Sequence, residues 1–328
     1  MYASSLIHSI RIAVVAGLAA LPGAAFAASL TPGTPIAIPH THGKFDFIRT
    51  DTYAHRLLLG HEGNGSFDLF DLDARSVLAV VPTGTAQDAA VDVGRHRYYV
   101  SGNNPGRTVI VDARSFAILG QVALPADTDL IAYDAATRLI HESNDTAPEE
   151  WLIDPSTRTV VSTLRFKGHG VEDLVFSPRY RRLFQAVKGS NTIAEIDPTT
   201  QSVLAQWSLA PDKNPHGIAL DPAADRLIVA CAGKLVLMNA SNGAIVARAP
   251  IAEGVDEIAY DASRHTVYCA SRKGLISVVR IAGDTLVPKG DVSDAKTGSI
   301  TVDTTTHLVW IAYGNKSGAW VQPFTPAS

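Results

Sequence analysis

The sequence repeats itself about every 42 residues. An apolar stretch that ends in a polar residue, nearly always an aspartate, recurs seven times along the chain. We call this last residue the anchor; the seven anchors are Asp51, Asp92, Asp134, Ser177, Asp221, Asp261 and Asp303, at intervals of 41, 42, 43, 44, 40 and 42 residues. A period of this length is typical of arrays whose units bury their faces only against neighbouring units.

Each unit carries the pattern of four short strands. After the anchor come a turn, a second apolar run such as RLLLG or RLIVAC, a third run that ends in Asp or Asn, and a fourth run. No segment shows the 3.6-residue period of a helix. Two β-sandwiches and a β-solenoid are the alternatives, but sandwiches do not enforce such a period and solenoid coils are shorter. We therefore predict an all-β fold, a seven-bladed β-propeller of four-stranded antiparallel blades.

The two ends of the chain predict how the ring closes. The seventh unit stops one strand short, and residues 34–39 resemble the fourth strands that precede the other units. We expect this N-terminal strand to complete the last blade, which leaves neither sheet edge open. Residues 28–328 would then form one propeller domain.

Residues 1–27 have the pattern of a secretory signal peptide. One formal charge, Arg11, precedes an apolar run over residues 12–26, which ends in the Ala-Phe-Ala motif of a cleavage site. An uncleaved membrane anchor is the alternative, but Pro22 and Gly23 break the run. No other segment is long enough to span a bilayer. We expect an exported protein, periplasmic or secreted, without a membrane span after cleavage, and monomeric.

Charge and cysteine content exclude several functional classes. The chain has 28 Lys and Arg against 32 Asp and Glu, a net charge of −4, and loss of Arg11 makes it −5. Such a balance argues against nucleic-acid binding, which depends on neutralising phosphates. The two cysteines, Cys231 and Cys269, form no CxxC motif, which excludes thiolate zinc and c-type haem. They fall in adjacent blades, too far apart for a disulfide, and we expect buried free thiols.

The stretch RYYVSGNNPGRTVIVDARSFAILGQVAL at residues 97–124 resembles the YVTN-type repeat of YncE-like β-propellers, and residues 214–231 are similar. The resemblance extends over residues 36–324. It implies a seven-bladed propeller that is exported, and it implies little about function because the family is mostly uncharacterised. DNA binding is suggested for some members, but the negative charge of this chain argues against it.

Acidic residues gather where each inner strand is expected to begin. The first strand of a blade lines the central channel, and its start lies at one mouth. Of the fourteen residues five and four places before the anchors, seven are acidic and none is basic, whereas chance gives about 1.5 acids. The five-before residues are Asp46, Gln87, Asp129, Glu172, His216, Asp256 and Gly298; the four-before residues are Phe47, Asp88, Leu130, Asp173, Gly217, Glu257 and Ser299.

The five-before row is the candidate binding site. Strict alternation along a strand would instead turn the four-before row toward the channel, and the sequence leaves this open. Two carboxylates about 6 Å apart repel by roughly 2–3 kcal/mol at an effective dielectric of 20, so a ring of them favours a bound cation. Carboxylates with one imidazole suit Ca²⁺, Mg²⁺, Mn²⁺ or Zn²⁺. The predicted metal ligands are Asp46, Asp129, Glu172, His216, Asp256 and Asn144.

The alternative is a solvated rim, or acids paired with nearby bases. Arg49, Arg107, Lys188 and Arg272 are the candidate bases. Most other histidines fall in turns on the opposite face. His216 and His141 are the candidate acid or base groups, and neither belongs to an HExxH motif.

Two functional hypotheses follow. The first is a non-catalytic propeller that binds a small ligand, a divalent cation or a partner protein at its acidic mouth. The second is a metal-dependent hydrolase or lactonase in which the carboxylates hold a cation and His216 or His141 moves protons. Propellers host both kinds of function, so the fold does not decide between them.

Overall fold

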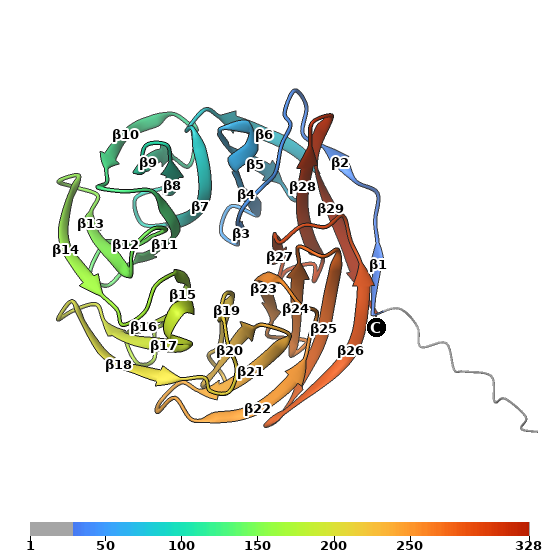
Figure 1. Cartoon of the computed structure of the whole chain (residues 1–328). Helices are drawn as coiled ribbons and strands as arrows, with labels where there is room; N and C mark the ends of the chain where they lie inside the picture. The colour runs from blue at the N-terminus through green and yellow to red at the C-terminus, as the bar shows by residue number, and fades with distance from the viewer. Residues whose placement is uncertain (1–28, 328) are drawn as a thin grey trace, which may run out of the picture.

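Seven antiparallel sheets form a closed ring around a central channel (Figure 1). The structure, a computed structural model, describes residues 29–327. In blades 1 to 6 the strands follow one another in chain order, the first next to the channel and the fourth on the outside, whereas the N-terminal segment supplies the outer strands of blade 7. This confirms the prediction of a seven-bladed propeller. The predicted signal peptide lies outside the described residues.

The strands have the following bounds, blade by blade. Blade 1 comprises β3 (Ile48–Asp51), β4 (Arg56–His61), β5 (Ser66–Asp71) and β6 (Ser76–Val81); blade 2, β7 (Thr85–Asp92), β8 (Arg97–Asn103), β9 (Arg107–Asp112) and β10 (Ile118–Ala123). Blade 3 comprises β11 (Thr128–Asp134), β12 (Leu139–Asn144), β13 (Glu149–Asp154) and β14 (Thr159–Arg165); blade 4, β15 (Val171–Ser177), β16 (Arg182–Val187), β17 (Thr192–Asp197) and β18 (Ser202–Ser208). Blade 5 comprises β19 (Ile218–Asp221), β20 (Arg226–Cys231), β21 (Lys234–Asn239) and β22 (Ile245–Pro250); blade 6, β23 (Val255–Asp261), β24 (Thr266–Ser271), β25 (Leu275–Ala282) and β26 (Thr285–Ser293). Blade 7 comprises β27 (Ile300–Val302), β28 (Val309–Asn315), β29 (Gly318–Pro326) and the N-terminal strands β1 (Leu30–Pro32) and β2 (Ile36–Ala37). Two 3₁₀ turns, η1 (Glu62–Asn64) and η2 (Lys188–Ser190), follow β4 and β16. No helix within residues 29–327 is long and apolar enough to cross a bilayer.

The N-terminal segment closes the ring, as predicted, but with two short strands in place of one. β1 pairs with β29 from Leu30 opposite Pro326 to Pro32 opposite Phe324, and β2 pairs with β29 at Val321 and Trp320. Between them Gly33 passes so close to Pro323 that a Cβ atom would lie 2.9 Å from the proline Cγ. The predicted strand at residues 34–39 contains β2, and β1 extends the pairing toward the N-terminus.

The anchor aspartates shape the turn after each inner strand and join neighbouring blades. The Asp51 carboxylate accepts hydrogen bonds from the backbone N–H groups two and three residues on, and the residue four on, His55, has a positive φ. The same carboxylate accepts a hydrogen bond of 2.7 Å from Tyr98 Oη of blade 2. His55 in turn reaches Asp303 of blade 7 at 3.0 Å. These contacts lie on the face opposite the mouth and explain why the anchors are acidic.

The hydrophobic core lies between blades as well as within them. One cluster packs Leu58, Phe67 and Leu69 of blade 1 against Tyr98 and Val100 of blade 2. Because each blade buries its face only against the next, the blades stabilise one another as a ring. Cys231 and Cys269 lie in this core as buried free thiols, as predicted.

Backbone register breaks occur where the acidic rows begin. β7, β11, β15 and β23 each shift register against their second strands, between Ala86 and Ala89, Thr128 and Ile131, Val171 and Leu174, and Val255 and Glu257. The acidic residues of the two rows in these blades lie within or at the edge of these breaks. A bulge leaves residues out of the ladder and redirects their side chains, so strict alternation does not hold there. Both rows consequently reach the channel.

Arg49 of β3 binds the four-before acids across the channel. Its guanidinium donates two hydrogen bonds of 2.9 Å to Asp88 of blade 2 and one of 2.9 Å to Asp173 of blade 4, and lies 3.9 Å from Glu257 of blade 6. The three carboxyl side chains are at most 2 % exposed. This pairing is the one that the sequence analysis considered as an alternative to ligand binding.

The same carboxylates also accept backbone hydrogen bonds from the next blade. Ile218 N–H donates to Asp173 at 3.2 Å, and Ile300 N–H donates to Glu257 at 2.8 Å. Burial nevertheless raises the pKa of both acids, and the Arg49 charge counteracts it. We call Arg49, Asp88, Asp173 and Glu257 the axial cluster. It joins blades 1, 2, 4 and 6 at the centre of the ring and forms the floor beneath the mouth.

Substitution of Leu30 tests how the N-terminal strand closes the ring. Its side chain is fully buried against Val309 and Phe324 of blade 7. We expect Leu30→Ala to lower the free energy of unfolding by about 2–4 kcal/mol, because it leaves a cavity at the closing strand. Leu204→Ala is the matched control, since Leu204 lies in the outer strand of blade 4 and is 49 % exposed. Denaturant unfolding measures both, and equal effects would contradict this account of closure.

Substitution of Arg49 tests whether the axial cluster stabilises the ring. We expect Arg49→Met to lower the free energy of unfolding at pH 8 by about 3–5 kcal/mol, since it leaves buried carboxylates without their counter-ion. An acid whose folded-state pKa is raised contributes stability below its unfolded pKa and loses it as pH rises through the folded pKa. The deficit should therefore shrink as pH falls from 8 toward 5.

Arg165→Met is the control for this experiment. Its side chain is 75 % exposed and pairs with Glu149 at 3.4 Å on the surface, so a loss below about 1 kcal/mol is expected. An Arg49→Met protein as stable as the wild type at pH 8 would show that the axial cluster does not hold the ring.

Candidate functional site: an acidic mouth

The five-before side chains meet above the axial cluster at one end of the channel. Asp46 and His216 precede β3 and β19, whereas Asp129, Glu172 and Asp256 are the second residues of β11, β15 and β23. These five residues come from blades 1, 5, 3, 4 and 6. We call them the mouth ring.

One part of the mouth ring is an ion-paired network. Arg272, which follows β24, donates through Nε to Asp256 at 2.8 Å and lies 3.3 Å from Asp46. His216 Nδ1 lies 3.0 Å from Glu172 Oε2 and 3.6 Å from Asp256 Oδ1. The chain of contacts therefore runs through blades 1, 6, 5 and 4.

Lys188, in the turn η2, completes this network at 3.3 Å from Glu172. Burial alone would raise the pKa of Glu172, but His216 and Lys188 outweigh it, and the pKa lies below its ordinary value. Of the four candidate bases, Lys188 and Arg272 thus pair with acids of the mouth ring, and Arg49 pairs with those of the axial cluster. The fourth, Arg107, instead donates to the carbonyl oxygens of Thr83 and Pro105.

Asp129 stands apart from this network. Its side chain makes no hydrogen bond or ion pair with any residue of 29–327. Burial raises its pKa well above the ordinary value, and the charges of Asp46, Glu172, Asp145 and Asp256 raise it further. Asp129 is half-buried, so its carboxyl group remains in contact with solvent. It is an acid that faces other acids without a counter-ion in the described part of the chain.

Asp46 also titrates abnormally. Burial and the charge of Asp256 raise its pKa to about 7, against the lowering effect of Arg272. Glu62 raises the pKa further and Lys44 lowers it; these two pair with each other at 2.5 Å at the lip of the mouth. The charge of the mouth therefore changes near neutral pH.

Two of the predicted site residues are buried and have partners within blade 3. The Asn144 amide oxygen accepts hydrogen bonds from the N–H groups of Thr146 and Ala147 and shapes a turn. His141 is fully buried in β12, where Nδ1 contacts Glu150. His216 is the predicted histidine that lies among the mouth carboxylates.

Two further acids lie at the lip of the mouth, outside the two aligned rows. Asp145 follows β12 and Glu62 follows β4, so both lie in mouth-side loops. Each influences the pKa of a mouth acid. Their signal was an acid directly after a second strand, which the alignment on inner strands did not consider.

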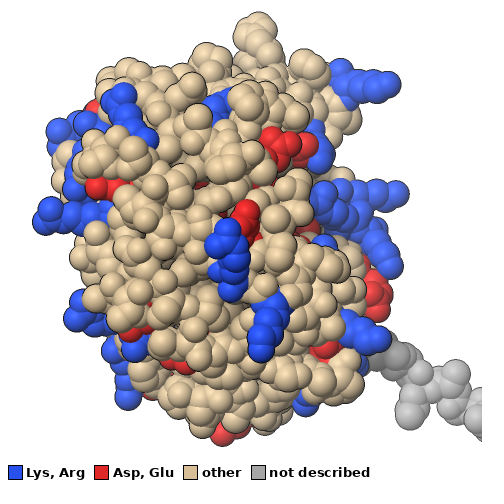
Figure 2. All heavy atoms as spheres, turned by 60° about the vertical axis from the view of Figure 1, so that its left-hand side comes forward, with Lys and Arg blue, Asp and Glu red and all other residues tan. Residues whose placement is uncertain are grey.

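The mouth has an excess of acid. Six carboxyl groups, those of Asp46, Glu62, Asp129, Asp145, Glu172 and Asp256, face the permanent cations of Lys44, Lys188 and Arg272. Within residues 29–327 no three His, Cys, Asp or Glu side chains are grouped so as to hold one metal ion. Outside the channel, Figure 2 shows Lys and Arg side chains spread over the outer surface with Asp and Glu between them. A cluster with an excess of acid has a negative local potential.

No family model matches this chain, and no curated protein sequence matches it. The resemblance to YncE-like propellers thus stays a prediction from the quoted repeats.

Solved structures match the fold over nearly the whole chain. A chain in the crystal structure of the mitotic checkpoint complex matches with a TM-score of 0.76 at 12 % sequence identity. The match covers 98 % of this chain and 99 % of that chain. A chain of hydrazine synthase from Kuenenia stuttgartiensis has a TM-score of 0.73 at 13 % identity, covering 89 % and 99 %. The WD40 repeats of RRP9 have a TM-score of 0.72 at 11 % identity, covering 90 % and 99 %. At these identities the likeness shows the seven-bladed, WD40-like propeller and nothing further about function.

Proposed function

We propose that this protein is a non-catalytic binding scaffold whose acidic mouth receives a cationic group. The cation is an ammonium or guanidinium of a small molecule, or a basic side chain of a partner protein. Following the pattern of residues 1–27, we place this binding outside the cytoplasm. A similar propeller occurs in a structure of the mitotic checkpoint complex, so a propeller of this shape can also be part of an assembly.

Asp129 carries this proposal. Each other acid of the mouth ring has a basic partner: Arg272 for Asp46 and Asp256, and Lys188 for Glu172. Asp129 has none among the described residues and lies under the field of four other acids. A cation placed beside Asp129 would favour the charged form of its carboxyl group and oppose the effect of these acids on its pKa.

The mouth already holds one guanidinium group between two carboxyl groups. The Arg272 guanidinium lies between Asp46 and Asp256, which belong to different blades. Planar guanidinium groups match carboxylates because they offer several donors in one plane. A ligand cation beside Asp129 and Glu172 would repeat this arrangement on the other side of the mouth.

The predicted divalent cation is the second form of cation that these carboxylates could receive. The metal-dependent hydrolase hypothesis depends on it, with His216 as the proton-transfer group. An organic cation fits the described residues better, because no metal-ligating group of three side chains is assembled within residues 29–327. The experiment below separates the two.

Replacing Asp129 tests the proposal. We expect spermidine and arginine amide to bind the purified protein, and Asp129→Asn to weaken binding about tenfold, since a charge-assisted contact is lost. Asp73→Asn is the control, because Asp73 is 80 % exposed on the opposite face beside His55. Isothermal titration calorimetry measures both.

The same titrations with Ca²⁺, Mg²⁺, Mn²⁺ and Zn²⁺ test the metal alternative. Binding of one metal that Asp129→Asn abolishes, without binding of organic cations, would replace our proposal by the divalent site. No binding of any cation, or equal binding by both variants, would show that the mouth is not a cation site.

The pKa of Asp46 predicts a pH dependence. Below pH 7 this carboxyl group is largely protonated, and above pH 7 it is charged, because its pKa is about 7. Affinity for the organic cation should therefore rise between pH 6 and pH 8. Asp46→Asn should flatten this rise, and Asp73→Asn should preserve it. An affinity that falls over this range would contradict the assignment of Asp46 to the site.

A further inference from the structure

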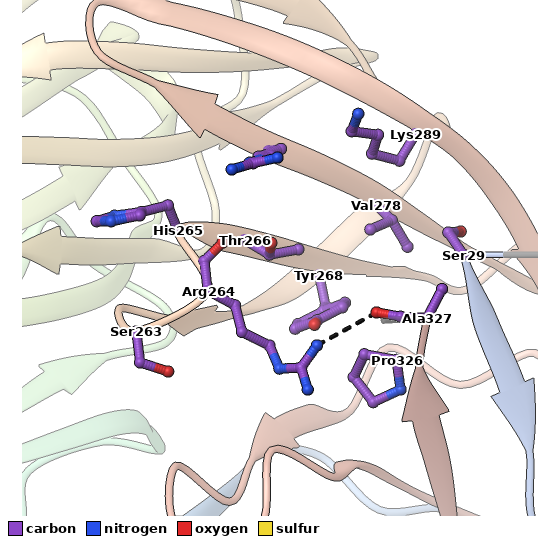
Figure 3. A pocket seen from close by; sticks show the side chains of 11 residues that line it. Ser29, Ser263, Arg264, His265, Thr266, Tyr268, Val278, Lys289, Pro326 and Ala327 are labelled. Carbon is purple, nitrogen blue, oxygen red and sulfur yellow. Dashed lines mark hydrogen bonds between the residues drawn. The ribbon is translucent and has the colours of Figure 1, made fainter.

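A second hollow lies between blades 6 and 7, on the face opposite the mouth (Figure 3). Its volume is about 460 Å³, which is within the usual range for small-molecule pockets. The turn after β23 forms one wall, β24, β25 and β26 form another, and the ends of blade 7 at Ser29, Pro326 and Ala327 form the third. Asp256 and the Ser263 turn stand at opposite ends of β23, so this pocket is separate from the mouth.

The pocket is lined by bases and by no acid. Arg264, His265, Arg280 and Lys289 all line it, whereas Asp and Glu are absent from its described lining. Within residues 29–327, Arg280 and Lys289 make no ion pair or side-chain hydrogen bond. Both are exposed. They are free to turn toward a ligand.

Two side chains at the pocket have hydrogen-bond donors without an acceptor among residues 29–327. Tyr268 is 1 % exposed, and its hydroxyl makes no hydrogen bond with any described residue. Burial raises its pKa to about 12, so the hydroxyl keeps its proton. Arg264 Nη1 donates to the Ala327 carbonyl at 3.2 Å, but its Nε has no hydrogen-bond acceptor and lies 3.8 Å from Asp261. Figure 3 shows both side chains at the pocket.

Val278, Pro326 and Ala327 form the apolar part of the lining. Val278 belongs to the cluster that packs Tyr268 against Leu30 and Phe324, and Pro326 lies beside Ala327 at the end of β29. A buried polar group without a partner costs free energy, and a ligand that accepts hydrogen bonds would remove this cost. The occupant that fits therefore has an anionic head and an apolar body.

We propose that this pocket binds a small organic anion. Its carboxylate or phosphate accepts hydrogen bonds from Tyr268 Oη and Arg264, Arg280 and Lys289 supply further positive charge at the rim, and the apolar body lies on Val278 and Pro326. The proposal is independent of the acidic mouth, because the two pockets share no residue.

Phenyl phosphate is the probe, titrated into the purified protein by isothermal titration calorimetry. We expect saturable binding, weakened about tenfold by Tyr268→Phe and about tenfold by the double variant Arg280→Gln/Lys289→Gln, because charge-assisted hydrogen bonds are lost. Lys234→Gln is the matched control, an exposed lysine of blade 5 outside the pocket, and should bind as the wild type does. Asp129→Asn should also leave this binding unchanged, so failure here and failure at the mouth are distinguishable.

Further ligands define the chemistry. Benzoate in place of phenyl phosphate distinguishes a carboxylate from a phosphate, and inorganic phosphate tests whether the apolar body contributes. Benzyl alcohol should not bind, because it lacks the charge. The rim variants change exposed side chains and should leave the melting temperature unaltered. Absence of binding by both organic anions, or binding that neither Tyr268→Phe nor the double variant weakens, would overturn the proposal.

Discussion

The contact between Arg49 and the four-before acids is the interaction on which the centre of the ring depends. One guanidinium from blade 1 meets carboxylates from blades 2, 4 and 6 at a depth where these side chains are almost fully buried. A buried carboxylate without a partner would cost several kcal/mol, so the cation and the acids are required together. The inner strands also bind one another through these acids, since Asp173 and Glu257 accept backbone N–H groups of the following blade.

The axial cluster gives the two acidic rows different roles. Both rows reach the channel because bulges interrupt the inner strands at this point. The four-before acids are neutralised below by Arg49, whereas the five-before acids share Arg272, Lys188 and His216 at the mouth. Asp129 is the acid of the mouth ring that has no basic partner among residues 29–327. The same residue type at adjacent positions is therefore structural in one row and available to a ligand in the other.

The propeller also carries opposite charges at its two faces. The mouth gathers carboxyl groups and titrates near pH 7 through Asp46, whereas the hollow between blades 6 and 7 gathers arginine, lysine and histidine. Hydrogen bonds of the anchor aspartates lie on the second face and hold the blades together there. A chain of nearly neutral net charge thus has an acidic cluster at one end of the ring and a basic cluster at the other. The net charge of the whole chain, −4, reflects neither of these two local charges.

The sequence by itself determined the number of blades, the four strands of each, the closure by the N-terminal segment and the positions of the acids. These features are local: each blade is a continuous stretch, and its period and turns are visible in neighbouring residues. Only the tertiary structure decided which acids are neutralised. Arg49 and Asp173 are 124 residues apart, and Arg272 and Asp46 are 226 residues apart. Side-chain alternation could not reveal these partners, because bulges break it where the acids begin. The burial of His141 against Glu150 likewise became visible only in the structure, because burial depends on contacts between strands that no local pattern records.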